Sequence, residues 1–178
     1  GKTTMSSMLA KIAMDAGLDP TVHVGGFVDL LGGGVRLGHS PLFVTEACEY
    51  VDSYLHLHPT VEIVSNIDND HLDYFKTEEN IYKSFESYVS LLPQDGLLIV
   101  CADDEKAGRL GREAKAQGRR VVAYGIGAGD WQAKNITADH LGDTAFDVLR
   151  EGEFAAHVTL LEPGDHNVRN ALAAIAAA

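Results

Sequence analysis

The sequence predicts an α/β protein with a mostly parallel sheet, helices on both of its faces, and a small antiparallel sheet near the C-terminal end. Short apolar runs alternate with segments of helical periodicity over most of the chain, as they do in parallel sheets covered on both faces. From residue 132 to 161 the pattern changes to strand-length segments separated by turn residues. With 178 residues, we expect one domain with a substantial core and an antiparallel appendage.

The first four residues, GKTT, have the form of the last four of the phosphate-binding loop G-x-x-x-x-G-K-S/T, so we expect a sheet of the P-loop type. Apolar residues at helical spacing predict a helix over residues 5–16, whose N-terminus would suit a polyphosphate. Lys2 is then expected on the β- and γ-phosphates, and the Thr3 hydroxyl on Mg²⁺. So short a match also arises by chance, and the strand and first glycine of the motif are not in the chain, so we expect a chain truncated within this loop.

Five apolar runs between residues 21 and 124 have the length of strands. They lie at residues 21–24, 42–45, 61–67, 97–101 and 120–124. Two helices are expected among the later runs, because apolar positions from Ile81 to Leu92 share one helical face and residues 103–117 read as a charged surface helix. Turn residues then separate three further strands, and a loop precedes an alanine-rich helix. These strands lie at residues 133–138, 144–150 and 154–161, the loop at 163–167 and the helix at 168–178.

Charge and cysteine content narrow the classes of function. The chain has 14 Lys and Arg against 26 Asp and Glu, a formal net charge of −12, which disfavours nucleic acid and anionic membranes as partners. Any bound phosphate must therefore be held by a helix N-terminus, a lysine and a divalent metal. Cys48 and Cys101 lack the spacing of a metal or redox site, so we expect two buried, reduced thiols in a cytoplasmic protein. These 178 residues contain no signal-peptide or membrane-span pattern.

Polar residues follow two of the expected strands, and ligands of open parallel sheets collect at the carboxyl ends of the strands. Glu46 follows the run 42–45, and the acidic stretch 66–73 follows the next run. Together with Thr3, a carboxylate at this edge would suit Mg²⁺. His71 differs from these oxygen ligands, because imidazole is a poor ligand for Mg²⁺. It could equally be a turn histidine that forms a hydrogen bond with a neighbouring aspartate. Glu46 could equally be a strand-end carboxylate in solvent.

Four stretches, taken together and in order, resemble the motifs of the Mur ligase family. They read GKTT at 1–4, TEACEYVDS at 45–53, NIDNDHLD at 66–73 and PGDHNVRN at 163–170. The resemblance covers nearly the whole chain and is strongest to the alanine-adding branch. It implies that residues 1–178 are the central ATP-binding domain of a three-domain enzyme, without its N-terminal UDP-binding and C-terminal amino-acid-binding domains.

The resemblance also implies roles for single residues. The catalytic residues are Lys2 and His71, and the metal ligands are Thr3, Glu46 and His71, the histidine helping to hold a second metal near the acceptor carboxylate. The ATP-binding residues are Gly1, Lys2, Thr3, Thr4, His166, Asn167 and Asn170, of which the asparagines contact the adenine end. The asparagines could also merely form a capped turn before a helix. In several members of the family, a carbamylated lysine in the helix after the motif at 66–73 serves as an extra metal ligand. Glu86 aligns with that position, and Lys83 lies one turn earlier. The sequence leaves open which of the two, if either, takes the place of the carbamylated lysine.

The reaction implied by the resemblance joins UDP-N-acetylmuramate to L-alanine through an acyl phosphate in peptidoglycan precursor synthesis, with ATP and with Mg²⁺ or Mn²⁺. We expect the isolated piece to be inactive. Alternatives are a ligase that adds a peptide to the same sugar nucleotide, a folylpolyglutamate synthase-like ligase, and a P-loop ATPase switch. A switch has no need of the motif at 66–73 or of the terminal asparagines, which argues against it.

Overall fold

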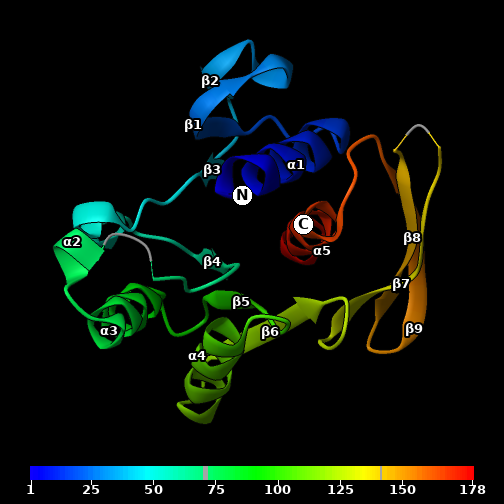
Figure 1. Ribbon diagram of the computed structural model, residues 1–178. Helices are drawn as coiled ribbons and strands as arrows, with labels where there is room; N and C mark the ends of the chain where they lie inside the picture. The colour runs from blue at the N-terminus through cyan, green and yellow to red at the C-terminus, as the bar shows by residue number, and fades with distance from the viewer. Residues whose placement is uncertain (70–71, 141) are drawn as a thin grey trace.

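A computed structural model describes residues 1–69, 72–140 and 142–178 of the chain (Figure 1). The main sheet has six strands in the order β4-β5-β6-β7-β8-β9, of which the first three pairs are parallel and the last two antiparallel. They are β4 (Val61–Val64), β5 (Leu97–Cys101), β6 (Arg120–Gly125), β7 (Trp131–Ala138), β8 (Thr144–Arg150) and β9 (Glu153–Leu160). The predicted fold class is confirmed, with one difference: the antiparallel strands extend the parallel sheet through β6 and β7.

Helices cover both faces of the main sheet, as predicted. α5 (Asp165–Ala177) lies on one face with α1 (Lys2–Asp15) packed against it, while α3 (Glu78–Val89) and α4 (Glu105–Ala116) lie on the other, α3 being preceded by the short α2 (Leu72–Phe75). β5 is buried on both faces, because Ile99 packs with Leu172 of α5 and Val100 packs with Leu110 of α4. The uninterrupted apolar sequence of this strand is therefore the signature of a central, doubly covered strand.

The strands expected at 21–24 and 42–45 form a separate three-stranded sheet in the order β2-β1-β3. β1 (Thr21–Val28) pairs in parallel with β3 (Phe43–Thr45) and antiparallel with β2 (Gly33–Arg36), and α1 packs against β1 and β3. Two 3₁₀ helices, η1 (Asp29–Leu31) and η2 (Tyr50–His56), follow β1 and β3. The sequence does not predict β2, because its glycines read as a loop. Gly34 is needed there, since a Cβ would lie 3.1 Å from the carbonyl oxygens of Val24 and Gly26.

Local hydrogen bonds explain where several helices begin. The Asp104 carboxylate accepts from the Ala107 N–H at 2.8 Å and starts α4, and Thr77 caps α3 in the same way. α1 and α5 each begin three residues before the predicted start, so the phosphate-loop side chains lie in the first turn of α1 and the terminal asparagines in the first two turns of α5. None of the helices in the described ranges combines the length and the apolar character that a membrane span needs.

One prediction about burial is wrong. Cys101 on β5 is buried, as expected, but Cys48 is exposed. Cys48 lies in the loop after β3 between Glu46 and Glu49, whose side chains both bond to the first turn of α1. The loop therefore directs its two carboxylates inward and leaves the intervening thiol in solvent.

Candidate functional site

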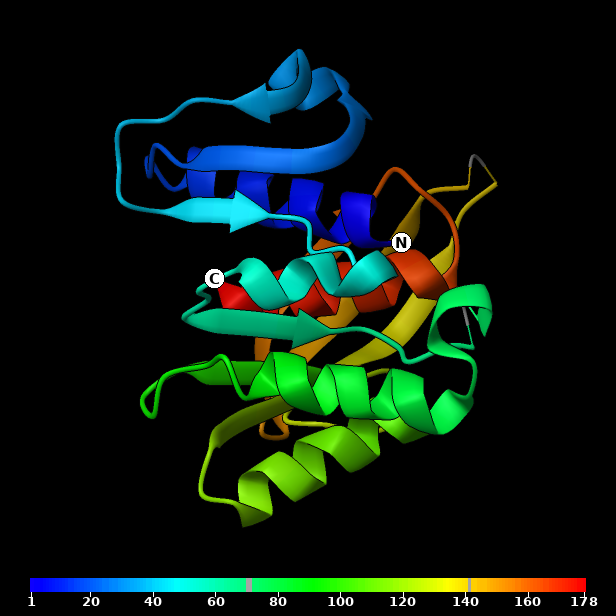
Figure 2. The same ribbon diagram turned by 90° about the vertical axis from the view of Figure 1, so that its left-hand side faces the viewer.

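The first turn of α1 meets the loop that follows β3. The Thr3 hydroxyl donates to Oε2 of Glu46 at 2.9 Å, and the Lys2 ammonium donates to Oε2 of Glu49 at 2.6 Å, while Thr4 is half-buried in the same turn. The start of α1 and the carboxyl ends of β3 and β4 lie on the same side of the molecule (Figure 2). The structure thus brings Lys2, Thr3 and Glu46 together at the end of the strands where ligands of such sheets collect.

The small sheet fixes the position of Glu46. Its backbone N–H donates to the His23 carbonyl oxygen at 2.9 Å, which continues the parallel pairing of β3 with β1. The N–H of Gly25 donates to the Glu46 carboxylate, also at 2.9 Å. A Cβ on Gly25 would lie 3.3 Å from the same carboxylate oxygen, so a glycine lets the carboxylate approach the backbone of β1. One carboxylate is therefore held between β1 and the Thr3 hydroxyl of α1.

The oxygen donors at this place suit a hard divalent cation. Thr3 and Glu46 offer a hydroxyl and a carboxylate, which are ligands of the kind that Mg²⁺ prefers. Two protein oxygens suffice where phosphate oxygens and water complete the coordination shell. Within residues 1–69, 72–140 and 142–178, no three His, Cys, Asp or Glu side chains gather into a metal site. His71 lies outside the described residues, so its metal-binding and catalytic roles stay predictions.

A hollow of about 290 Å³ opens beside the N-terminus of α1. Its walls come from the carboxyl ends of β4, β5 and β6 and from the first two turns of α5. The residues that line it are Gly1, Ser65, Asn66, Cys101, Asp103, Asp104, Tyr124, His166, Arg169 and Asn170. Its volume is at the lower end of the range for small-molecule sites. Because Gly1 lines it, the hollow adjoins the phosphate-loop sequence.

The asparagines expected at the adenine end of ATP lie in the first two turns of α5, and both are buried. Asn167 donates from Nδ2 to the Pro163 carbonyl oxygen at 3.0 Å, and Asn170 donates to Oδ1 of Asn167 at 3.4 Å. Asn170 and the exposed His166 line the hollow. The geometry therefore separates the two asparagines: Asn170 faces the hollow, and Asn167 holds both Asn170 and the preceding loop in place.

Asp103 organises the same hollow, although it belongs to none of the four motifs. Its carboxylate accepts from Arg169 Nε at 2.8 Å and from the backbone N–H groups of Ile126 and Gly127 at 2.8 and 3.0 Å. Burial alone would raise its pKa, but these three donors outweigh burial and hold the pKa of Asp103 below its ordinary value. The signal that could have found it is its position just after β5, at the carboxyl end of a buried parallel strand.

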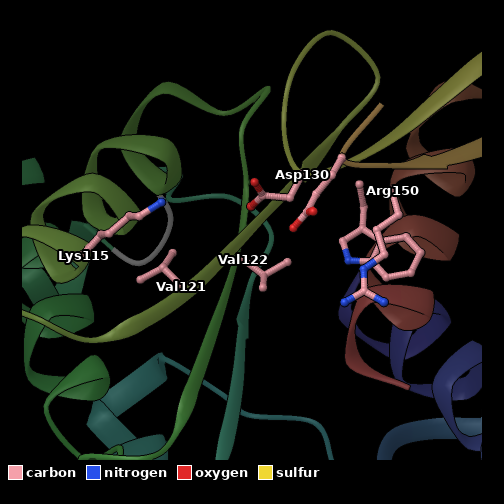
Figure 3. A pocket seen from close by; sticks show the side chains of 7 residues that line it. Lys115, Val121, Val122, Asp130 and Arg150 are labelled. Atoms are coloured by element: carbon pink, nitrogen blue, oxygen red, sulfur yellow. The ribbon is translucent and has the colours of Figure 1, made fainter. Parts of the chain in front are cut away.

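A second hollow, of about 190 Å³, lies near the amino end of β6 and does not adjoin the phosphate loop. It is lined by Lys115, Val121, Val122, Asp130, Trp131, Arg150 and Glu151 (Figure 3). Arg150 lies over the Trp131 ring, 5.3 Å from its centre, and Asp130 accepts from the Ala123 N–H at 2.8 Å. These polar groups therefore already have partners within the fold, and we assign no ligand to this hollow.

Lys83 and Glu86, the two positions considered for a carbamylated lysine, are both exposed on α3. Lys83 pairs with Glu79 at 2.8 Å. α3 covers the face of the main sheet opposite α1 and α5 (Figure 1), so the fold gives neither residue a place beside Thr3.

A parallel sheet, a helix whose N-terminus carries GKTT and a carboxylate against its first turn define an α/β domain of the P-loop type. The family model for the Mur ligase middle domain matches residues 1–178. The chain therefore belongs to the Mur ligase family, as the four motifs in its sequence indicate.

Similar proteins extend this assignment. The UDP-N-acetylmuramate–L-alanine ligases of Caldanaerobacter subterraneus subsp. tengcongensis and Clostridium kluyveri are 48% and 45% identical over 99% and 98% of this chain, which spans 38% of each of them. Among solved structures, the UDP-N-acetylmuramate-alanine ligase MurC of Thermotoga maritima has a TM-score of 0.84 at 30% identity, over 99% of this chain and 38% of that one. The MurF ligase of Thermotoga maritima in complex with ADP has a TM-score of 0.77 over 99% of this chain and 42% of that one, and its 17% identity supports the fold alone.

Proposed function

We propose that the protein is an ATP-dependent, ADP-forming ligase that joins UDP-N-acetylmuramate to L-alanine in peptidoglycan precursor synthesis, and that this chain is its ATP-binding part. One observation carries the proposal: the Thr3 hydroxyl and the Glu46 carboxylate, 43 positions apart, meet at 2.9 Å beside Lys2. A phosphate-loop hydroxyl next to a strand-end carboxylate suits a metal-bound triphosphate. The relatives that carry this activity in their names are 41–48% identical over nearly the whole chain.

The division of labour within the protein is part of the proposal. This chain spans 38% of the curated relatives, so other parts of the protein have room to bind the remaining substrates. We assign the UDP group to an N-terminal domain and L-alanine to a C-terminal domain. The 178 residues alone would then bind nucleotide at most, without ligase turnover.

The chemistry brings two anions together. The substrate carboxylate attacks the γ-phosphorus of ATP, ADP leaves, and an acyl phosphate forms; the amine of L-alanine then attacks the acyl carbon, loses a proton, and inorganic phosphate leaves. Lys2 would neutralise charge on the β- and γ-phosphates, and the N–H groups at the start of α1 would add partial positive charge. Their work is electrostatic, because little proton transfer is needed in the phosphate-transfer step.

Thr3 and Glu46 are the residues that would hold Mg²⁺, or Mn²⁺ in its place. A bound cation supplies neutralisation of charge between the phosphates and the attacking carboxylate. The Gly25 N–H orients the Glu46 carboxylate for this role. We keep His71 as a proposed ligand of a second cation near the acceptor carboxylate.

The adenine end of ATP is assigned to the hollow between β5, β6 and α5. Gly1 and Thr4 would contribute to the phosphate end, and His166, Asn167 and Asn170 to the adenine end. Asn170 on the wall can form hydrogen bonds with a base, while Asn167 supports it from behind.

The test uses the full-length protein that contains this chain. ADP release is measured with ATP, Mg²⁺ and UDP-N-acetylmuramate, in the presence of L-alanine, of a tripeptide, or of neither, and separately with a folate and glutamate. Release that requires L-alanine and is abolished by Lys2→Ala is expected. Release with the tripeptide or with folate instead would assign one of the related ligases, and release without any acceptor would assign a nucleotide switch.

A further inference from the structure

Lys2, the side chain proposed to bind the phosphates, is already paired with a carboxylate. Its ammonium lies 2.6 Å from Oε2 of Glu49, whose side chain is only 17% exposed against 41% for Lys2. Glu49 comes three residues after Glu46, which accepts from Thr3. Two glutamates of one loop thus bond to the two leading side chains of the phosphate loop, and the proposed function uses only the first of them.

Nucleotide binding must change the pair of Lys2 and Glu49. A triphosphate that takes Lys2 replaces Glu49 as its partner and brings several negative charges next to the Glu49 carboxylate. A nucleotide that arrives with a divalent cation carries less net negative charge, so it meets less repulsion from Glu49. Because Glu49 is largely shielded from solvent, this repulsion is screened less than it would be between exposed groups.

We propose that Glu49, through its charge beside Lys2 at the phosphate site, selects cation-bound ATP over free ATP. The inference rests on the proposed function, since it requires a nucleotide at Lys2. It assigns the two glutamates opposite effects: Glu46 attracts the cation, and Glu49 disfavours a nucleotide that comes without one.

The test measures ATP binding to the full-length protein by calorimetry, once with Mg²⁺ and once with EDTA. Glu49→Gln keeps the size of the side chain and removes its charge. Affinity for ATP in EDTA is expected to rise about three- to tenfold, while affinity for ATP with Mg²⁺ changes by less than about twofold. Glu49→Asp keeps the charge, so it is expected to preserve most of the wild-type ratio between the two affinities.

Glu79→Gln is the matched control, because Glu79 also pairs with a lysine, Lys83 at 2.8 Å, and its neutralisation changes the net charge by the same amount on α3. Equal affinity ratios for Glu49→Gln and Glu79→Gln would overturn the inference, and so would equal gains with and without Mg²⁺. If the wild-type protein binds ATP neither with Mg²⁺ nor with EDTA, the proposed function itself is contradicted. If the wild-type protein binds Mg²⁺-ATP and Glu49→Gln leaves the ratio of the two affinities unchanged, this inference is wrong but the proposed function is not contradicted.

Discussion

Arg169 on α5 donates from Nε to Oδ2 of Asp103 at 2.8 Å, although the two residues are 66 positions apart in the chain. The same carboxylate accepts from the backbone of Ile126 and Gly127 in the loop after β6. One aspartate therefore ties together the loop after β5, the loop after β6 and the helix that carries the terminal asparagines. The shape of the hollow depends on this link.

Asp103→Asn is expected to destabilise the protein by about 1–2 kcal/mol at pH 7, because it removes the ionised acceptor of three hydrogen bonds. The folded-state pKa of Asp103 lies below its unfolded value, so this contribution is present above the unfolded pKa and is lost as pH falls through the folded pKa. Urea denaturation at pH 7 and pH 3 measures both effects. Glu162→Gln, at an exposed carboxylate, is the control, and equal losses for the two variants would contradict the prediction.

Two glycines of α4 give a matched pair of substitutions. A Cβ on Gly111 would lie 2.6 Å from Cγ2 of the buried Val100, so Gly111→Ala is expected to destabilise the protein by about 1–3 kcal/mol through overpacking. A Cβ on Gly108 would lie 3.4 Å from the end of the Arg112 side chain and in ordinary contact, at 3.7 and 3.8 Å, with the carbonyl oxygens of Ala102 and Cys101. Gly108→Ala is therefore expected to stabilise the protein by up to about 1 kcal/mol through helix propensity. Chemical denaturation of the two variants measures the difference, and changes of the same sign would contradict it.

The alternation of apolar runs and helical periodicity predicts most of the fold. A strand that is buried on both faces has an apolar sequence that can be recognised without knowledge of its neighbours. The separate small sheet is not predictable in this way. Its strand β2 contains Gly33 and Gly34, which read as a loop, and the close approach of Gly34 to the Val24 carbonyl explains the second of these glycines. Such an approach is a tertiary relationship that no local pattern contains.

The residues of the site also differ in whether a local sequence pattern reveals them. Lys2, Thr3 and Glu46 are identifiable from the sequence because each belongs to a short motif. Glu49 lies in the same motif as Glu46, but the motif does not show that Glu49 pairs with Lys2, 47 positions away. Asp103 belongs to none of the four motifs, and its partner Arg169 is 66 positions away. Both pairings depend on how α1 and α5 pack, which the sequence pattern leaves undetermined.

Glu46→Gln is expected to separate cation binding from nucleotide binding. The amide keeps the size of the side chain, so the loop after β3 is retained, but it replaces a carboxylate oxygen that suits Mg²⁺ with a neutral group. Affinity for ATP with Mg²⁺ is expected to fall at least about tenfold, while affinity in EDTA does not fall, because the lost carboxylate charge would repel a cation-free triphosphate. Calorimetry on the full-length protein measures both, with Glu79→Gln as the control for net charge. A uniform loss under both conditions would indicate a structural defect instead of a lost cation ligand.

Glu62 on β4 is a buried carboxyl group whose two oxygens have no hydrogen-bond partner within the described part of the chain. The stacked rings of Tyr54 and Tyr88 and the charge of Arg119 are near enough to interact with it electrostatically. Burial raises the pKa of Glu62 from 4.5 to about 8, and Arg119 opposes this only in part. At neutral pH the folded protein therefore holds Glu62 mainly in its protonated form.

A raised pKa makes the stability of the wild-type protein depend on pH in a defined direction. Keeping Glu62 buried has no ionisation cost below its unfolded pKa near 4.5, and the cost grows by up to about 1.4 kcal/mol per pH unit until pH passes the folded value near 8. Glu62→Gln removes this dependence, so the variant is expected to match the wild type at pH 5 and to be more stable at pH 9. Urea denaturation at pH 5, 7 and 9 measures the difference, with the exposed Glu86→Gln as the control. A constant difference between wild type and Glu62→Gln across this range would show that Glu62 does not titrate within the folded state.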